Sequence, residues 1–249
     1  MLDADEPEAA EVVNPRAPSP FLLIGDHGGQ RVPRALAQLG LPDAELSRHI
    51  GWDIGVTALG EALSAALDAT FVHQRYSRLV IDCNRTPDAL DAMPAVSDAT
   101  VVPGNANLDL AARAARVAAV HAPYHAAIAA GIAQRTAGGQ ATALVALHSF
   151  TPVMRGVARP WHAGILHNGA NDALARAMLA GLRAEGDLTV GDNEPYAMDR
   201  IDYTVPRHAF AAGLPYVEIE VRQDLLADAA GVAAWAARLA RLLPRAAGD

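Results

Sequence analysis

Two histidines follow apolar runs of the chain, in positions where a ligand could reach them. Residues 21–25 and 141–147 are short apolar segments, and His27 and His148 come just after them. In open α/β sheets ligands bind beyond the carboxyl ends of the strands, so both side chains are expected at one edge of a sheet. A catalytic zinc needs about three protein ligands and an open position for water. We therefore predict a metal site that contains His27 and His148.

The third ligand of this site has two candidates. Asp53 lies in the segment GWDIG, and its carboxylate is a suitable zinc ligand. Alternatively, Asp53 is the N-cap of the following helix, a position where Asp is favoured. Gln30 stands three residues after His27, although an amide is a poor zinc ligand. We expect Asp53 to complete the site, with Gln30 as the alternative.

A late apolar segment, residues 216–222, carries charged residues at alternate positions. Glu218, Glu220 and Arg222 share one face of the expected strand, because successive side chains of a strand point to opposite sides. A carboxylate beside an activated water can take its proton and later return it to a leaving amine. The spacing by itself does not separate Glu218 from Glu220 as this base, and an ion pair with Arg222 is the structural alternative.

The charge of the chain excludes several kinds of site. There are 28 acidic and 20 basic residues, giving a net charge of −8, and every basic residue is arginine. Without lysine there is no Schiff base and no Walker-type phosphate loop. The negative charge and the absence of an arginine-rich stripe argue against nucleic-acid binding, and no apolar run reaches membrane length. The single cysteine, Cys83, excludes an intrachain disulfide, so a cytoplasmic protein is expected.

Strands and helices are expected to alternate along most of the chain. This order favours one α/β/α sandwich with a largely parallel sheet, formed by residues 21–249. The acidic residues 1–20, rich in Pro and Ala, are expected to be a loose leader, and residues 86–107 a long irregular segment. The expected strands cover residues 21–25, 70–73, 79–83, 141–147, 162–167, 190–196 and 216–222, and the main helices cover 53–67, 108–137, 172–184, 204–212 and 232–243.

Six segments carry a resemblance to a known family. In chain order they are DHGGQRVP, GWDIG, SRLVIDCNR, HSFTP, GDNEPY and EIEVRQDL, and they extend from about Phe21 to Leu226. Together they resemble the N-formylglutamate amidohydrolase family, which is similar in fold and site to zinc carboxypeptidases and aspartoacylases. The resemblance implies a single three-layer α/β/α domain of the phosphorylase/hydrolase type, with a mostly parallel mixed sheet and one catalytic zinc.

The resemblance also implies roles for individual residues. His27, Asp53 and His148 would hold the zinc, and Glu220 would be the general base, since its surroundings are similar to a Glu-Leu-Arg-Asp stretch of carboxypeptidases. Arg78 would stabilise the oxyanion, unless it pairs with Asp82. Asn84 and Arg85 match an Asn-Arg pair that binds the substrate carboxylate, and the other predicted substrate contacts are Ser149, Asn193, Tyr196 and Arg222.

The implied reaction is hydrolysis of an N-formyl or N-acyl acidic amino acid, with N-formylglutamate giving formate and glutamate, as in histidine degradation. A second possibility is an amidohydrolase of different acyl or amino-acid specificity. A third is a non-catalytic protein that binds a small acidic ligand, since the His-x-x-Glu pattern of carboxypeptidases is missing here. The partner is thus a small molecule, and the protein is expected to be a monomer or a small homo-oligomer.

Overall fold

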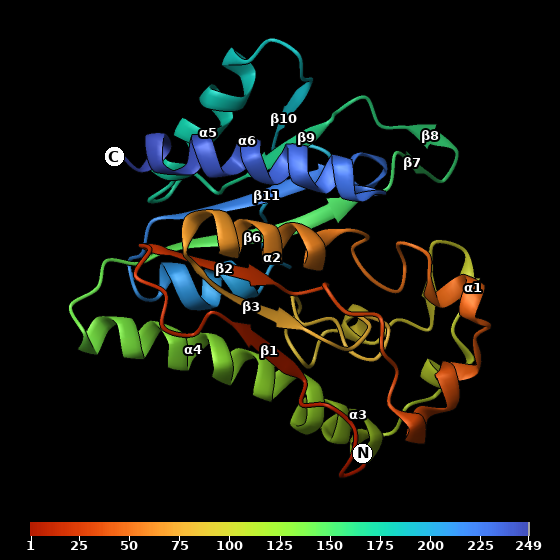
Figure 1. Cartoon of the computed structure of the whole chain (residues 1–249). Helices are drawn as coiled ribbons and strands as arrows, with labels where there is room; N and C mark the ends of the chain where they lie inside the picture. The colour runs from red at the N-terminus through yellow and green to blue at the C-terminus, as the bar shows by residue number, and fades with distance from the viewer. Residues whose placement is uncertain (249) are drawn as a thin grey trace.

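A seven-stranded sheet runs through the centre of the protein (Figure 1). The structure is a computed structural model that describes residues 1–248. The four strands β3, β2, β6 and β11 are parallel to one another, while β1 is antiparallel to β3, and β9 is antiparallel to β11. Across the sheet the strands are β1 (Ala10–Val13), β3 (Thr70–Gln74), β2 (Phe21–Gly25), β6 (Ala143–Phe150), β11 (Tyr216–Arg222), β9 (Ala163–Leu166) and β10 (Val190–Asp192).

Helices cover both faces of this sheet. One apolar cluster joins α2 (Val56–Leu67), α5 (Ala173–Ala184) and α6 (Ala229–Ala247) to one face, and a second joins α4 (Ala122–Ala137) to the other (Figure 1). Neighbouring residues of one strand enter different clusters, as Leu23 and Leu22 do in β2, because their side chains point to opposite faces. The predicted three-layer α/β/α sandwich with a mostly parallel mixed sheet is confirmed.

The remaining elements are short and lie mostly in the loops. No helix among residues 1–248 is both long and apolar enough to cross a membrane. A helical path continues from α3 through a π-helical turn into α4, where a single long helix was predicted. The short elements are α1 (Asp43–Leu46), α3 (Leu110–Arg116), the π-helical turns Val117–His121 and Pro206–Phe210, the 3-10 helices Arg34–Gly40, Leu90–Ala92, Pro103–Asn105 and Gln223–Leu226, and the two-residue strands β4 (Val96–Ser97), β5 (Thr100–Val101), β7 (Val153–Met154) and β8 (Val157–Ala158).

Helix α6 shows why the sequence forms these elements. Its buried residues Trp235, Leu239 and Leu242 recur every three or four positions, which places them on one face of a helix. The Asp228 side chain accepts a hydrogen bond from the Gly231 N–H and so caps the first turn. Burial of each large apolar side chain contributes about 1.5–3 kcal/mol. The helix therefore forms where its apolar stripe can pack against α2 and α5.

The strand predicted over residues 79–83 is wrong. Leu79, Val80 and Ile81 are buried, which explains their apolar character, but the segment does not join the sheet. The Val80 N–H donates to the Ser77 carbonyl at 2.9 Å, and the Asp82 N–H donates to a carbonyl of the following loop at 2.7 Å. A short apolar run reports burial and not backbone conformation, so periodicity could not separate a strand from buried coil.

The loose leader predicted over residues 1–20 is also wrong for much of its length. Ala10–Val13 forms the edge strand β1, which pairs with β3. Arg34 forms ion pairs with Asp3 and Asp5, and its backbone N–H donates to Glu6. The acidic residues that made this segment look like a solvated tail thus have partners that lie later in the chain.

Candidate metal centre and active site

His27, Asp53 and His148 come together beyond the ends of two neighbouring strands. His27 follows β2, and His148 lies near the end of β6, which is parallel to β2 and pairs with it. One potential ligand atom from each residue lies within 4.8 Å of those from the other two. Their exposed fractions are 2%, 3% and 3%, so all three are buried. This group has the composition of a three-ligand metal site.

Asp53 is held at this position by the segments that carry the two histidines. Its N–H donates to the His27 carbonyl at 2.9 Å, and its Oδ2 accepts from the Ser149 N–H at 3.2 Å. The His148 Nδ1 lies 3.0 Å from the same Oδ2. Gly55 is the N-cap of α2, so the helix-cap reading of Asp53 is wrong. Gln30 is exposed and lines a different hollow of the surface.

Each histidine also has a carboxylate behind it, which sequence reasoning missed. Asp82 Oδ1 lies 2.7 Å from His27 Nε2, and Asp26 Oδ2 lies 3.4 Å from His148 Nε2. The second oxygen of Asp26 accepts a hydrogen bond from Thr204. Such outer carboxylates set the orientation of metal-binding imidazoles. The signal was that Asp26 precedes His27 directly and that Asp82 stands two residues before Asn84.

Several buried atoms of this cluster lack a hydrogen-bond partner among residues 1–248. They are His27 Nδ1, His148 Nε2, Asp26 Oδ2 and Glu220 Oε2. A buried polar atom without a partner costs about 1–3 kcal/mol, which a bound metal and its water would recover at His27 Nδ1 and Glu220 Oε2. His148 Nε2 and Asp26 Oδ2 face each other at 3.4 Å. Imidazole nitrogen and carboxylate oxygen are both donors that zinc accepts. The residues present therefore fit a zinc ion.

Neighbouring charges control the protonation of the cluster. Burial opposes the charged form of His148, but the neighbouring carboxylates of Asp26 and Asp53 raise its pKa well above the usual value. Burial likewise opposes ionisation of Asp82, yet Arg78 and His27 hold the pKa of this carboxyl well below its usual range. In the metal-free protein these are pairs of opposite charges, which stabilise each other where water is excluded.

Glu218 and Glu220 of β11 face the same space from the third strand. β11 is parallel to β6, and Glu220 is in register with His148. Ile219 and Val221 point into the apolar core, as the alternation predicted. Burial raises the pKa of Glu218 to about 8 and that of Glu220 to about 7. A carboxyl group with a pKa near neutrality can both accept and return a proton in catalysis.

Arg78 joins two of the carboxylates. Its Nη2 donates to Asp82 Oδ2 at 2.7 Å, and its Nη1 donates to Asp53 Oδ1 at 3.3 Å. The side chain borders the cavity that contains the histidines. The pairing with Asp82, which was the structural alternative for this arginine, is present.

Asn84 and Arg85 border the cavity but already have partners. Asn84 Oδ1 accepts from the N–H groups of Tyr203 and Thr204, both at 2.9 Å, and Nδ2 donates to Asp202 at 3.2 Å. Arg85 Nε donates to Asp91 at 3.0 Å. The predicted carboxylate-binding pair is thus engaged with residues of the protein.

The other four predicted substrate contacts divide into two groups. Ser149 and Tyr196 line the cavity, and the Ser149 hydroxyl donates to the Ile54 carbonyl at 2.9 Å. Asn193 and Arg222 are not among the described residues that line it. Asn193 forms a turn, with its side chain accepting from the His167 N–H, and Arg222 pairs with Asp224 at 2.7 Å. These two contacts of the sequence prediction are not brought to the site.

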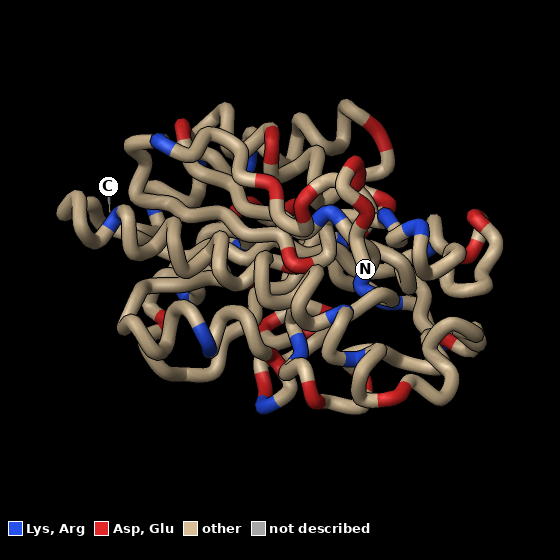
Figure 2. Tube along the Cα trace, turned by 90° about the horizontal axis from the view of Figure 1, so that it is seen from below, with Lys and Arg blue, Asp and Glu red and all other residues tan. Residues whose placement is uncertain are grey.

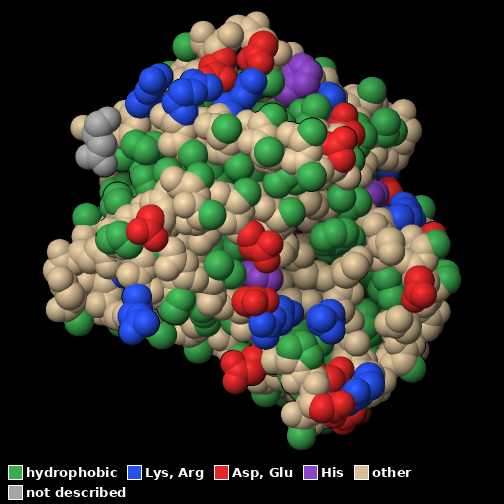
Figure 3. Space-filling view, viewed as in Figure 1, with side chains coloured by type: hydrophobic (Ala, Val, Ile, Leu, Met, Phe, Trp, Pro, Cys, Tyr) green, Lys and Arg blue, Asp and Glu red, His purple; other side chains and the backbone are tan. Residues whose placement is uncertain are grey.

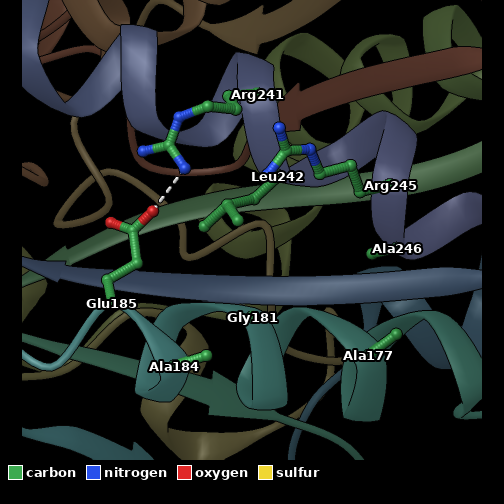
Figure 4. A pocket seen from close by; sticks show the side chains of 8 residues that line it. All are labelled: Ala177, Gly181, Ala184, Glu185, Arg241, Leu242, Arg245 and Ala246. Atoms are coloured by element: carbon green, nitrogen blue, oxygen red, sulfur yellow. Dashed lines mark ion pairs between the residues drawn. The ribbon is translucent and has the colours of Figure 1, made fainter.

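The cavity has a volume of about 630 Å³. Residues of β4 and β7 also line it. A separate hollow lies between α5 and α6, where Glu185 pairs with Arg241 among small side chains (Figure 4). Basic side chains gather near the top of the molecule, over these two helices (Figure 3). This second hollow contains none of the predicted site residues.

Comparison with known proteins identifies one family and several structural relatives. The family model described as N-formylglutamate amidohydrolase matches residues 19–227. The crystal structure of gene product Atu2144 from Agrobacterium tumefaciens is 41% identical, with 99% of this chain and 98% of that chain covered and a TM-score of 0.94. An N-formylglutamate amidohydrolase from Ralstonia eutropha JMP134 is 21% identical, with 96% and 97% covered and a TM-score of 0.69, which shows the shared fold. Among the curated proteins, none matches this chain.

Proposed function

Because this chain belongs to the N-formylglutamate amidohydrolase family, we propose that it is a metal-dependent hydrolase of the amide bond in an N-acyl amino acid. The observation that carries the proposal is the buried group of His27, Asp53 and His148, which lines one cavity with Glu220 and in which His27 Nδ1 has no partner among residues 1–248. A general base beside three metal ligands is the arrangement that amide hydrolysis by an activated water requires.

His27, Asp53 and His148 would hold a zinc ion. When bound, the zinc would supply a water that ionises near neutral pH, and the ion itself would polarise the amide oxygen. Asp82 and Asp26 keep the two imidazole rings oriented toward the site. Asp53 contributes a negative charge, because His27, His148 and Arg78 keep it ionised. The ionised carboxylate of Asp53, held next to both histidines, favours Asp53 over Gln30 as the third ligand.

Glu220 would carry the proton between water and leaving group. Its carboxylate takes a proton from the attacking water and then donates it to the amide nitrogen, which leaves as an amine. Glu220 is favoured over Glu218 because it is in register with His148. Arg78 would stabilise the negative charge that develops on the amide oxygen. Its ion pairs with Asp53 and Asp82 hold the guanidinium at the cavity wall.

Two substrate specificities are open within this function. N-formylglutamate, the substrate in the family's name, would give formate and glutamate, with Arg85 binding a carboxylate. An amidohydrolase of different acyl or amino-acid specificity is the second candidate. It is favoured by one observation, since Asn84 Nδ2 and Arg85 Nε, two donors that would bind a substrate carboxylate, are already engaged by Asp202 and Asp91.

The test of the function is formate release by zinc-loaded protein from N-formyl amino acids, N-formyl-L-glutamate included. We expect Glu220→Gln to keep its zinc and to lose about 10²- to 10⁴-fold in kcat, as expected for removal of a general base. Glu185→Gln, at the distant α5–α6 hollow, is the matched control and should retain full activity.

Three outcomes would contradict parts of this assignment. Unchanged turnover in Glu220→Gln would remove this residue from the mechanism. A protein that takes up no zinc and yet binds a small acidic ligand would favour the non-catalytic alternative. A zinc-loaded protein that hydrolyses no N-acyl amino acid would contradict the proposed function.

A further inference from the structure

The cavity is acidic, although its proposed substrate carries a carboxylate. Eight Asp and Glu side chains line it, against three arginines. Arg78 is paired with Asp53 and Asp82, and Arg85 is paired with Asp91. Most charged positions of the chain lie on the side of the molecule away from the C-terminus, with acidic and basic residues interleaved (Figure 2). Of the three arginines, Arg78 and Arg85 are thus already paired with carboxylates of the protein, while Arg155 has no ion pair among residues 1–248.

Asp202 sits at the place where a substrate carboxylate was expected. One of its oxygens accepts from Asn84 Nδ2 at 3.2 Å, and the other accepts from the Asp199 N–H at 2.9 Å. These two hydrogen bonds fix the carboxylate and use only two of its four lone-pair directions. The side chain lines the cavity, so the remaining directions are available to a ligand.

Glu218 is the second carboxylate on this side of the cavity, and it has no hydrogen bond to any of residues 1–248. Its residue is 2% exposed, and it lines the cavity. The nearest cationic atom is His148 Nε2, at 4.0 Å from Glu218 Oε1. A buried carboxylate is normally paired or hydrogen-bonded. Glu218 is therefore a buried acceptor aimed into the cavity without a partner from the protein.

We propose that Asp202 and Glu218 form a subsite for a cationic group of the substrate. The substrate is then an N-acyl amino acid whose side chain ends in an ammonium or a guanidinium, rather than in a second carboxylate. An ammonium has three donors and no acceptor, which suits two carboxyl groups with free lone pairs, and a bound cation favours their ionised form. A substrate carboxylate in the same place would face Asp202 at a cost in repulsion and desolvation. This inference rests on the proposed function and specifies its substrate class.

The first test compares kcat/KM of the zinc-loaded protein for N-formyl-L-lysine, N-formyl-L-arginine, N-formyl-L-glutamine and N-formyl-L-glutamate. We expect the two cationic substrates to exceed glutamine, and glutamine to exceed glutamate, by about tenfold at each step. Glutamine and glutamate have the same shape, so their ratio isolates charge. A higher kcat/KM for glutamate than for glutamine would overturn the proposal.

The second test is Asp202→Asn, which keeps the acceptor for Asn84. The ratio of kcat/KM for N-formyl-L-lysine to that for N-formyl-L-glutamate should fall by about tenfold, mainly through KM. Asp224→Asn is the control, because Asp224 pairs with Arg222 and does not line the cavity. An unchanged lysine-to-glutamate ratio in Asp202→Asn, in protein that melts like wild type, would overturn the role of Asp202.

A binding measurement separates failure of this inference from failure of the proposed function. Titration calorimetry of zinc-loaded protein with L-lysine and L-glutamate requires no turnover. If none of the four formyl compounds is hydrolysed, the amidohydrolase proposal fails. Tighter binding of L-lysine than of L-glutamate, lost in Asp202→Asn, would still support the cationic subsite. Tighter binding of L-glutamate would overturn it.

Discussion

The two site histidines are prepared for a metal by residues that do not touch it. Asp82 binds His27 through Nε2, so that Nδ1 is the nitrogen left without a partner in the cavity. The same Asp82 also accepts from Arg78 and from the Asn84 N–H. One carboxylate therefore positions a proposed ligand, a proposed oxyanion contact and the loop that follows. We therefore expect a substitution of Asp82 to lower the affinity for the metal.

We expect Asp82→Asn to weaken zinc binding by about 10- to 100-fold, because an amide holds the imidazole less well than a carboxylate. Competition with a chromogenic chelator measures this change directly. Asp91→Asn is the control, since Asp91 pairs with Arg85 in the same loop region and contacts neither histidine. Equal zinc affinity in the two variants would show that Asp82 does not position His27.

At the scale of elements, the loop after β2 places His27 by passing close to β3. A Cβ at Gly29 would lie 2.1 Å from the carbonyl carbon of Arg75, so only glycine fits against this backbone. The Arg31 N–H donates to the Arg75 carbonyl at 3.2 Å, which joins the loop to the segment after β3. The contact is between two backbones, so no side chain can move to relieve a clash.

Gly29→Ala should therefore destabilise the protein by about 3 kcal/mol, the upper part of the usual cost of overpacking. Zinc affinity should fall as well, since His27 lies two residues away. Gly131→Ala is the matched control, because Gly131 lies within α4 and its Cβ would meet Leu22 only at 3.9 Å. That variant should gain about 0.5–1 kcal/mol. Urea unfolding reports both values, and equal midpoints for the two variants would contradict the close approach.

At the scale of the whole molecule, the site places several ionisable groups inside the protein. Burial raises the pKa of Glu218 to about 8 and of Glu220 to about 7, compared with 4.5 for an exposed glutamate. The pKa of His148 is also raised. Burial lowers the pKa of His125 to about 3 and that of His208 to about 4, so these two oppose the trend only below pH 6.5.

Between pH 6.5 and 8 the metal-free protein should lose stability as the pH rises. The folded state retains protons on Glu218, Glu220 and His148 that the unfolded chain has released, and groups with raised pKa values stabilise the fold only while they are protonated. With a chelator present throughout, Tm should fall by about 5 °C as the pH rises from 6.5 to 8. Calorimetry at several pH values measures it, and Glu218→Gln should show a shallower decline. A Tm that rises across this interval would contradict the buried carboxyl groups.

The sequence alone determined most of the strands of the central sheet and the family. Alternation in residues 216–222 predicted that Glu218 and Glu220 share a face, and the apolar runs before His27 and His148 predicted their position at strand ends. Both predictions rest on side-chain periodicity, which is a local property of the backbone. The order of strands and helices was sufficient for the three-layer fold for the same reason.

Only the tertiary structure decided which partner each polar group has. Asn84 and Asp202 are hydrogen-bonded across 118 positions of sequence, and His148 and Asp53 across 95. Neither contact leaves a local pattern, because it depends on how separate loops pack at one edge of the sheet. The same holds for residues 79–83, whose apolar run records burial and leaves the backbone conformation open. The three residues at the metal group could thus be named from sequence, while the carboxylates around them became visible only in the folded chain.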